Sequence, residues 1–269
     1  MFFNISVLHL ALAFAVGGIW VTLVTRIAEK FGSSVGGVLG GMPSTSALSF
    51  FFIGLNQSAP AAVQTTTVFP LAVSFTIFFL LMFALFARRG FLTGLLSSLF
   101  IWFLISAVIV IFRPENFFAS LVSGLIISGF VYFIFNQQLN LQAFGPNKDD
   151  RRTVPQLLAR AILAGSIIAL AVLCNQVGGP LFGAVFTAFP AMFTSTLIIA
   201  NQSGGVEFSR SMTKPLALSG ILTIIPFSIA VRYLYPSLGI WIGTLASYSI
   251  VAPLALLAYR VVNTNENRL

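Results

Sequence analysis

Two short segments place proline beside hydroxyl and apolar side chains, and their residue types and spacing could bind a small solute. The candidate residues are Met42, Pro43, Ser44 and Thr45 in the first segment, and Phe189, Pro190, Thr194 and Ser195 in the second. Proline has no backbone N–H and crowds the carbonyl four residues before it, so a helix that contains it leaves carbonyl groups unpaired. Such carbonyls, next to hydroxyls, are candidate substrate ligands. The structural alternative is a pair of packed kinks at helix contacts.

The residues that usually carry catalysis or bind metals are few and scattered. The chain has one cysteine (Cys174), one histidine (His9) and six acids. The acids all fall in predicted connections or tails: Glu29, Glu115, Asp149, Asp150, Glu207 and Glu266. Catalytic and metal sites need several such groups together, so we expect no enzyme, no cofactor and no metal. A carboxylate embedded in the membrane is usual for proton and cation antiport, and its absence favours a neutral, zwitterionic or anionic solute.

The composition is that of an integral membrane protein. Hydrophobic residues make up 58% of the chain and charged residues 7%, where soluble domains carry about 25% charged residues. A spanning helix needs about 20 apolar residues. Nine stretches meet this need: 4–25, 34–56, 61–87, 90–112, 116–136, 155–175, 179–201, 211–233 and 236–260. The long polar stretch 137–154 divides them into five and four and predicts a cytoplasmic loop.

The basic residues predict the orientation. With the N-terminus outside, twelve of the 14 Lys and Arg residues fall in inner connections, at inner helix ends or in the tail, and only Arg113 and Arg232 fall outside. Because lysine and arginine concentrate on the cytoplasmic side, this distribution predicts an outer N-terminus and an inner C-terminus. The net charge of +8 is thereby explained without nucleic acid.

The chain contains an internal repeat. Residues 56–74 and 201–219 share seven of 19 aligned positions, beginning with Asn-Gln-Ser and ending with Pro-Leu-Ala-x-Ser. The similarity extends upstream, where 36–43 aligns with 183–190. The predicted topology places the two copies upside down relative to each other. Inverted repeats with interrupted helices are typical of secondary transporters, which bind substrate near the middle of the membrane.

The polar residues and second prolines of the repeat have structural or gating interpretations. They are Asn56, Gln57 and Pro70 in the first copy, and Asn201, Gln202 and Pro215 in the second. We expect the Asn-Gln pairs to cap helices at the membrane interfaces, with a gate as the alternative. We expect the two prolines to kink their helices symmetrically.

Residues 189–210 contain, in order, Phe-Pro, a hydroxyl cluster, an apolar run, Gly-Gly, an acid and a base. This order resembles the pattern of the GlpM-like family of small bacterial membrane proteins. Members of that family are about one repeat long, so the present chain resembles a fused pair. The resemblance implies no catalytic or binding residues. The paired inverted architecture is also similar to the drug/metabolite transporter superfamily, whose members usually have ten helices as five plus five.

These observations predict an all-α integral membrane protein with about nine transmembrane helices in two inverted repeats. The parts are 1–136, the first repeat with an extra crossing helix; 137–154, the loop; and 155–269, the second repeat with a short tail. We expect a secondary transporter in a bacterial-type inner membrane, working by alternating access around the broken second and seventh helices. The alternatives are a flippase for lipid or lipid-linked substrates and a scaffold or accessory subunit. Expected partners are the lipid bilayer and a small-molecule substrate, with a homodimer left open and nucleic acid excluded.

Overall fold

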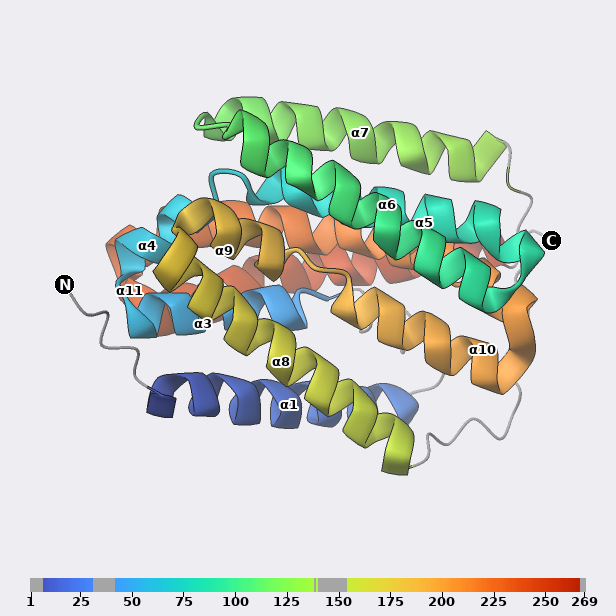
Figure 1. The fold of residues 1–269 in the computed structure, drawn as a ribbon, viewed down its shortest axis with the longest axis horizontal. Helices are drawn as coiled ribbons and strands as arrows, with labels where there is room; N and C mark the ends of the chain where they lie inside the picture. Colours follow the sequence, from blue (N-terminus) through green and yellow to red (C-terminus); the bar gives the residue numbers. More distant parts are fainter. Residues whose placement is uncertain (1–6, 31–41, 138, 140–153, 267–269) are drawn as a thin grey trace.

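The computed structural model describes residues 7–30, 42–137, 139 and 154–266, and all the regular structure in these ranges is helical (Figure 1). The helices are α1 (Val7–Lys30), α3 (Ser44–Asn56), α4 (Ala59–Thr65), α5 (Phe69–Phe86), the short 3-10 helix η1 (Ala87–Arg89), α6 (Phe91–Phe112), α7 (Phe117–Gln137), α8 (Val154–Gly178), α9 (Pro180–Thr187), α10 (Ala191–Ser211) and α11 (Thr213–Glu266). The predicted all-α class is confirmed for these ranges. The start of the second predicted span and most of the predicted 137–154 loop lie outside them.

Within the described residues, six helices are long and apolar enough to cross a membrane, which fits a multi-pass membrane protein. They are Phe69–Arg89, Phe91–Phe112, Phe117–Gln137, Val154–Gly178, Pro180–Gln202 and Gly204–Val261. The predicted count of nine is not confirmed. The first predicted span is represented by the shorter apolar stretch Leu8–Trp20. The second is described only from residue 42, and the last two are joined in one element.

That joined element, α11, is two antiparallel helical arms. Gly239, with φ 72° and ψ 176°, interrupts its helical backbone. The rings of Phe227 and Tyr248 lie 5.1 Å apart, although 21 residues of straight helix would separate them by about 32 Å. The hydroxyls of Tyr235 and Thr244 are also 2.7 Å apart across the bend. The chain therefore reverses at Gly239, which lies close to the start of the last predicted span, 236–260.

A similar reversal occurs in α10. Gly205 has φ 76°, and the Ser209 hydroxyl donates to the Leu197 carbonyl at 2.6 Å. These two residues would be about 18 Å apart along a straight helix. The last turns of α10 therefore fold back onto its first arm.

The predicted span 61–87 is broken into α4 and α5. The hydroxyls of Thr65 and Thr66 bond carbonyls of the preceding turn, at 2.8 and 2.6 Å. Pro70 lies in the first turn of α5, and Pro215 is the third residue of α11. The expectation that these prolines kink their helices is wrong. A proline in the first turn removes an N–H that has no partner within the helix, so a helix can begin there without distortion.

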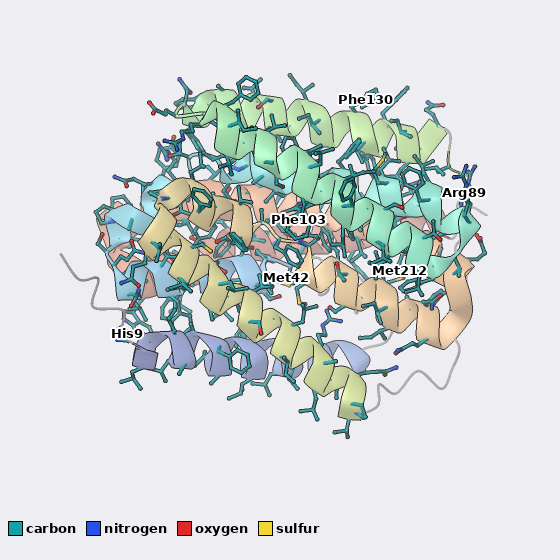
Figure 2. The ribbon with its side chains drawn as sticks, in the orientation of Figure 1. His9, Met42, Arg89, Phe103, Phe130 and Met212 are labelled. Carbon is teal, nitrogen blue, oxygen red and sulfur yellow. The ribbon has the colours of Figure 1, made fainter. Side chains whose placement is uncertain are left out.

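α5 is the central helix of the bundle. It contacts α6, α7, α9, α10 and α11, and Phe79, Leu80 and Phe83 are fully buried along it. The outer helices α6 and α7 instead expose large apolar side chains, such as Phe100 and Phe130, over 60%. Figure 2 shows Phe130 pointing away from the bundle. A continuous apolar exterior of this kind suits contact with lipid.

α1 and α8 pack at very short range through glycine. A Cβ on Gly165 would lie 2.4 Å from the Phe14 carbonyl oxygen, and one on Gly18 would lie 3.0 Å from the Ala161 carbonyl oxygen. Small residues allow helix backbones to approach closely where lipid replaces water as the solvent. Gly18 and Gly165 therefore lie in one helix–helix contact.

The structure groups the basic residues at two ends. Arg210 Nε donates to the Ala84 carbonyl at 2.9 Å, which brings it to the end of α5 that leads into Arg88 and Arg89. Arg232 lies over the Phe117 ring, 4.3 Å from its centroid, at the end where α6 passes to α7. Figure 2 shows His9 and Arg89 at opposite ends of the molecule. Arg113 and Arg232, the two predicted outer residues, are thus at the end opposite Arg89.

Candidate binding cavity

The two predicted breaks have the same backbone geometry. Pro43 has φ −73° and ψ 46°, and Pro190 has φ −74° and ψ 40°. In each break, the N–H after the proline donates to the carbonyl before it at 2.7 Å. The proline carbonyl then accepts the N–H four residues on at 2.8 Å. Each proline therefore ends a tight turn and starts a helix, α3 or α10. At Pro190, where α9 precedes the turn, this is a full interruption rather than the kink considered above.

The local sequence explains why α9 stops at this point. Proline cannot donate to the ladder, and it disfavours helical geometry in the residue before it. The free carbonyls at the end of α9 are taken up by the N–H groups of Ala188 and Phe189. The Ala188 carbonyl accepts the Thr76 hydroxyl from α5. The freed carbonyls predicted as ligands are therefore largely occupied within the protein.

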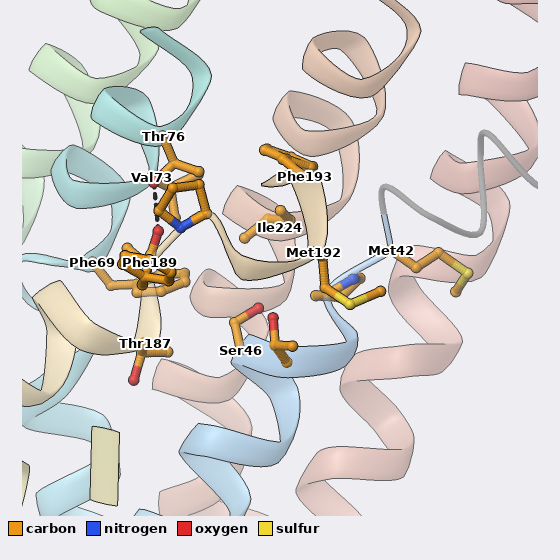
Figure 3. A pocket seen from close by; sticks show the side chains of 14 residues that line it. Met42, Ser46, Phe69, Val73, Thr76, Thr187, Phe189, Met192, Phe193 and Ile224 are labelled. Carbon is orange, nitrogen blue, oxygen red and sulfur yellow. Dashed lines mark hydrogen bonds between the residues drawn. The ribbon is translucent and has the colours of Figure 1, made fainter. Parts of the chain in front are cut away.

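Both breaks line one small cavity, which has a volume of about 30 Å³. Figure 3 shows Ser46 from α3 facing Met192 and Phe193 from α10 across it. Five of the eight predicted binding residues line it: Met42, Pro43, Thr45, Phe189 and Pro190. The lining residues that the prediction missed are Ser46, Phe69, Val73, Thr76, Thr187, Ala188, Met192, Phe193 and Ile224.

The other three predicted residues lie beside the cavity rather than along it. Ser44 and Thr194 are buried, and their hydroxyls have no hydrogen-bond partner among the described residues. The Ser195 hydroxyl donates to the Met192 carbonyl one turn back, at 3.0 Å. Sequence alone identified the hydroxyl clusters but not which face of each helix meets the cavity.

Two threonines, Thr187 and Thr45, lie at the cavity wall. Thr187, at the end of α9, is 2% exposed, and its hydroxyl has no partner among the described residues. Thr45, at the start of α3, is 9% exposed and also lines the cavity. Most of the remaining wall is aromatic or aliphatic, so the cavity has an apolar body with a few convergent polar groups, as small-molecule sites usually do.

An aromatic and hydroxyl network supports the second break. Thr76 Oγ1 accepts a hydrogen bond from Trp102 Nε1 at 3.1 Å while it donates to Ala188. The Trp102 ring also meets Phe189 edge to face, with centroids 5.2 Å apart. Trp102 is 1% exposed. α5 and α6 thereby hold the chain between α9 and α10 in place.

A buried cation lies behind the wall. Arg160 of α8 is 3% exposed, and its Nη2 lies 3.8 Å from the Met192 sulfur. The sequence assigned Arg160 to the inner end of its span as a topology signal. In the structure, its charged group also lies next to Met192, a residue of the cavity wall.

The Asn-Gln pairs link helices at their ends. Asn56 is the last residue of α3, and its side chain bonds Gln176 of α8 at 3.0 Å and His9 of α1 at 3.1 Å. Gln202 accepts from Gln156 of α8 at 2.6 Å. Gln57 occupies the C-cap position of α3, and Asn201 lies inside α10, half-buried. None of the four lines the cavity, and the hydroxyl that caps α4 belongs to Ser58, which bonds the Ala61 N–H.

A family described as a protein of unknown function (DUF3147) matches residues 10–114, which is less than half of the chain. No curated protein and no solved structure matches it. The matched residues include α3 and its proline turn, α4, α5 and α6. The resemblances to the GlpM-like family and to the drug/metabolite transporter superfamily are not confirmed by these comparisons.

Proposed function

We propose that this chain is a secondary transporter of a small solute that works by alternating access around α3 and α10. The observation that carries the proposal is the pair of equivalent proline turns, 147 positions apart, that open onto one cavity. Interrupted helices near mid-membrane are the usual substrate sites of such transporters, because their backbone groups face a cavity rather than lipid.

The proposal includes an inverted repeat, and two further correspondences support it. Gly90 and Gly239 both have positive φ, at 126° and 72°, and each starts a helical arm. Four residues later, Gly94 and Gly243 each contact the preceding arm so closely that an added Cβ would lie 2.7 or 2.8 Å from it. The family match ends at residue 114, between α6 and α7. α7 would be the extra crossing between the repeats.

A second correspondence concerns the helix ends. His9 of α1 contacts Asn56 after the first break, and Gln156 of α8 contacts Gln202 after the second. His9 and Gln156 are 147 positions apart, the same spacing as the two prolines, and their partners belong to the two aligned Asn-Gln pairs, the first residue of one pair and the second of the other. Repeats that exchange conformations would open the cavity first to one face and then to the other. The basic residues support an orientation with the Arg88–Arg89 end inside a bacterial-type inner membrane.

The test is access to the cavity from both faces of the membrane. In a Cys174→Ser background, Thr45→Cys and Thr187→Cys would be labelled with a membrane-impermeant thiol reagent in vesicles of each orientation. We expect both positions to react from both faces. Ser128→Cys is the matched control, because Ser128 is fully buried in α7 and does not line the cavity. If neither cavity position reacts from either face in folded protein, a scaffold role replaces transport.

A further inference from the structure

The cavity between α3 and α10 must widen before it can hold a solute. Its volume of about 30 Å³ has room for about two water molecules, since one water needs roughly 10–15 Å³. Four residues that line this space have a backbone N–H without a backbone acceptor among the described residues: Thr45, Ser46, Met192 and Phe193. Water suits these donors, but an organic solute needs more room. The contacts that hold the surrounding helices together therefore decide when the cavity opens.

Two arginines from the second half of the chain contact the α5 region on either side of the cavity. α5 forms part of the wall through Phe69, Val73 and Thr76. Arg232 of α11 bonds Thr67, just before α5 begins. Arg210 of α10 bonds Ala84, near the end of α5. The cavity therefore lies between two contacts that join the halves of the chain.

Arg232 makes the contact at the end where α6 passes to α7. Its Nη1 donates to the hydroxyls of Thr66 and Thr67, at 3.2 Å each, and to the Val63 carbonyl at 3.4 Å. Its guanidinium also lies 4.3 Å from the centroid of the Phe117 ring. All these partners are neutral, and neutral acceptors bind a guanidinium less strongly than a carboxylate does. The Arg232 contact can therefore be released at modest cost.

The Arg232 contact lies directly beyond the cavity. Thr67 precedes the lining residue Phe69 by two positions. Arg232 follows the lining residue Ile224 of α11 by eight positions, which is about 12 Å of helix. A path that leaves the cavity between α5 and α11 toward this end therefore meets the guanidinium.

Arg210 makes the contact at the opposite end. Its Nε donates to the Ala84 carbonyl at 2.9 Å, and its Nη1 bonds both carboxylate oxygens of Glu207 at 2.6 Å. Ala84 follows the lining residue Thr76 by eight positions, again about 12 Å of helix. The two contacts are thus similarly placed about the cavity, one toward each end of the molecule.

We propose that Arg232 and Arg210 are latches that hold the second half of the chain against α5, and that the cavity opens to each face of the membrane when the latch at that end releases. The Arg232 latch controls the end at Arg113, and the Arg210 latch controls the end at Arg88 and Arg89. This inference rests on the proposed transport function. It names the contacts that alternating access breaks in turn.

The experiment applies the same substitution to both latches. Arg232→Gln and Arg210→Gln each remove the charge and keep a polar side chain. Each is made in the protein that carries Cys174→Ser and Thr45→Cys. The rate of labelling by a membrane-impermeant thiol reagent is measured in vesicles of each orientation. The readout is the ratio of the rates from the two faces, because general destabilisation raises both rates together.

We expect the two variants to shift this ratio in opposite directions. Arg232→Gln should favour labelling from the Arg113 face by at least about tenfold, the factor that corresponds to the loss of a hydrogen bond to a charged group. Arg210→Gln should favour labelling from the other face by a similar factor. Unchanged ratios in folded variants, or shifts of both variants in the same direction, would overturn the proposal.

A milder variant tests the Arg232 latch without changing the arginine. Thr67→Val keeps the shape of the side chain and removes one acceptor of Arg232. We expect a shift of at least about threefold in the direction of Arg232→Gln. Thr93→Val, at an exposed position near the start of α6, is the matched control and should leave the ratio unchanged. An unshifted Thr67→Val ratio would contradict the latch.

Arg210 is 7% exposed, so its replacement can prevent folding. In that case Glu207→Gln tests the same latch, because it removes the carboxylate that holds the guanidinium. Glu207 is itself exposed. We expect a shift toward the Arg88–Arg89 face, and a shift toward the Arg113 face would overturn the assignment.

The latches and transport can fail separately. Labelling of the parent protein from both faces, with the same ratio in every variant, would reject the latches and leave transport in place. Labelling of the parent from neither face, with each arginine variant labelled from its own face, would support the latches and reject transport.

Discussion

The Thr76 hydroxyl of α5 donates a hydrogen bond to the backbone carbonyl of Ala188, 112 positions away, at the break between α9 and α10. The same hydroxyl accepts the Trp102 indole N–H. One small side chain on the central helix thus satisfies two buried groups from two other elements. It ties the cavity wall to the core of the bundle.

Replacing Thr76 with valine keeps its shape and removes the hydroxyl. We expect Thr76→Val to destabilise the protein by about 1–3 kcal/mol, because the Ala188 carbonyl and the Trp102 N–H both lose a partner. Denaturant titration in detergent, followed by Trp102 fluorescence, measures the effect. Thr93→Val is the control, since Thr93 is exposed at the start of α6. A Thr76→Val protein as stable as this control would show that the bond contributes nothing.

Restoring the missing N–H at the breaks should close the cavity. Alanine is favoured over proline inside a helix by about 3 kcal/mol, so Pro190→Ala allows α9 and α10 to join. We expect a folded protein in which labelling of Thr45→Cys falls at least about tenfold, and Pro43→Ala should act similarly. Pro60→Ala, in the first turn of α4 and exposed, should leave labelling unchanged. Unchanged labelling in both break variants would mean that the prolines do not maintain the opening.

The reversal in α11 depends on a backbone conformation open almost only to glycine. Gly239 has φ 72° and ψ 176°, and other residues pay about 1–3 kcal/mol there. An alanine Cβ at this position would meet nothing within 4 Å, so the cost of Gly239→Ala is conformational alone. Gly129→Ala is the matched control: it also has free space but lies within helix α7, where alanine is favoured by about 1 kcal/mol. Thermal denaturation should therefore shift in opposite directions for the two variants, and equal shifts would contradict the assigned strain.

Gly165 tests the close contact between α1 and α8. A methyl group there would lie 2.4 Å from the Phe14 carbonyl oxygen, so the two backbones must move apart. We expect Gly165→Ala to destabilise the protein by about 1–3 kcal/mol despite the higher helix propensity of alanine. Its denaturation midpoint can be compared with that of Gly129→Ala on the same parent. Stabilisation of both variants would show that α1 separates from α8 without cost.

The sequence predicted the structure well at positions where a single local rule decides the backbone conformation. Most helices follow from long apolar runs, and the breaks follow from the two prolines, because proline acts on its own backbone wherever it occurs. The prolines Pro70 and Pro215 were misjudged because helix starts and helix interiors look alike inside an apolar run. The hydroxyls of Thr65 and Thr66, which end α4, were the available signal for the correct boundary.

The cavity wall could be predicted only in part. Residues adjacent to the prolines were found by proximity in the chain, whereas Thr76, Phe69 and Ile224 reach the cavity from α5 and α11. Their positions depend on how helices pack, and one apolar helix face resembles another in sequence. The polarity of the site was also misjudged: proline frees carbonyls in a continuing helix, but here those carbonyls find partners and the N–H groups at the new helix starts do not.

Those N–H groups belong to the main chain, so they persist whichever non-proline side chain stands at residues 45, 46, 192 and 193. Substitutions at these four residues can change the width and the hydrophobicity of the cavity while the backbone donors stay in place. A lineage that inherits this fold can therefore alter the size of the cavity by single substitutions, with no intermediate that lacks the donors.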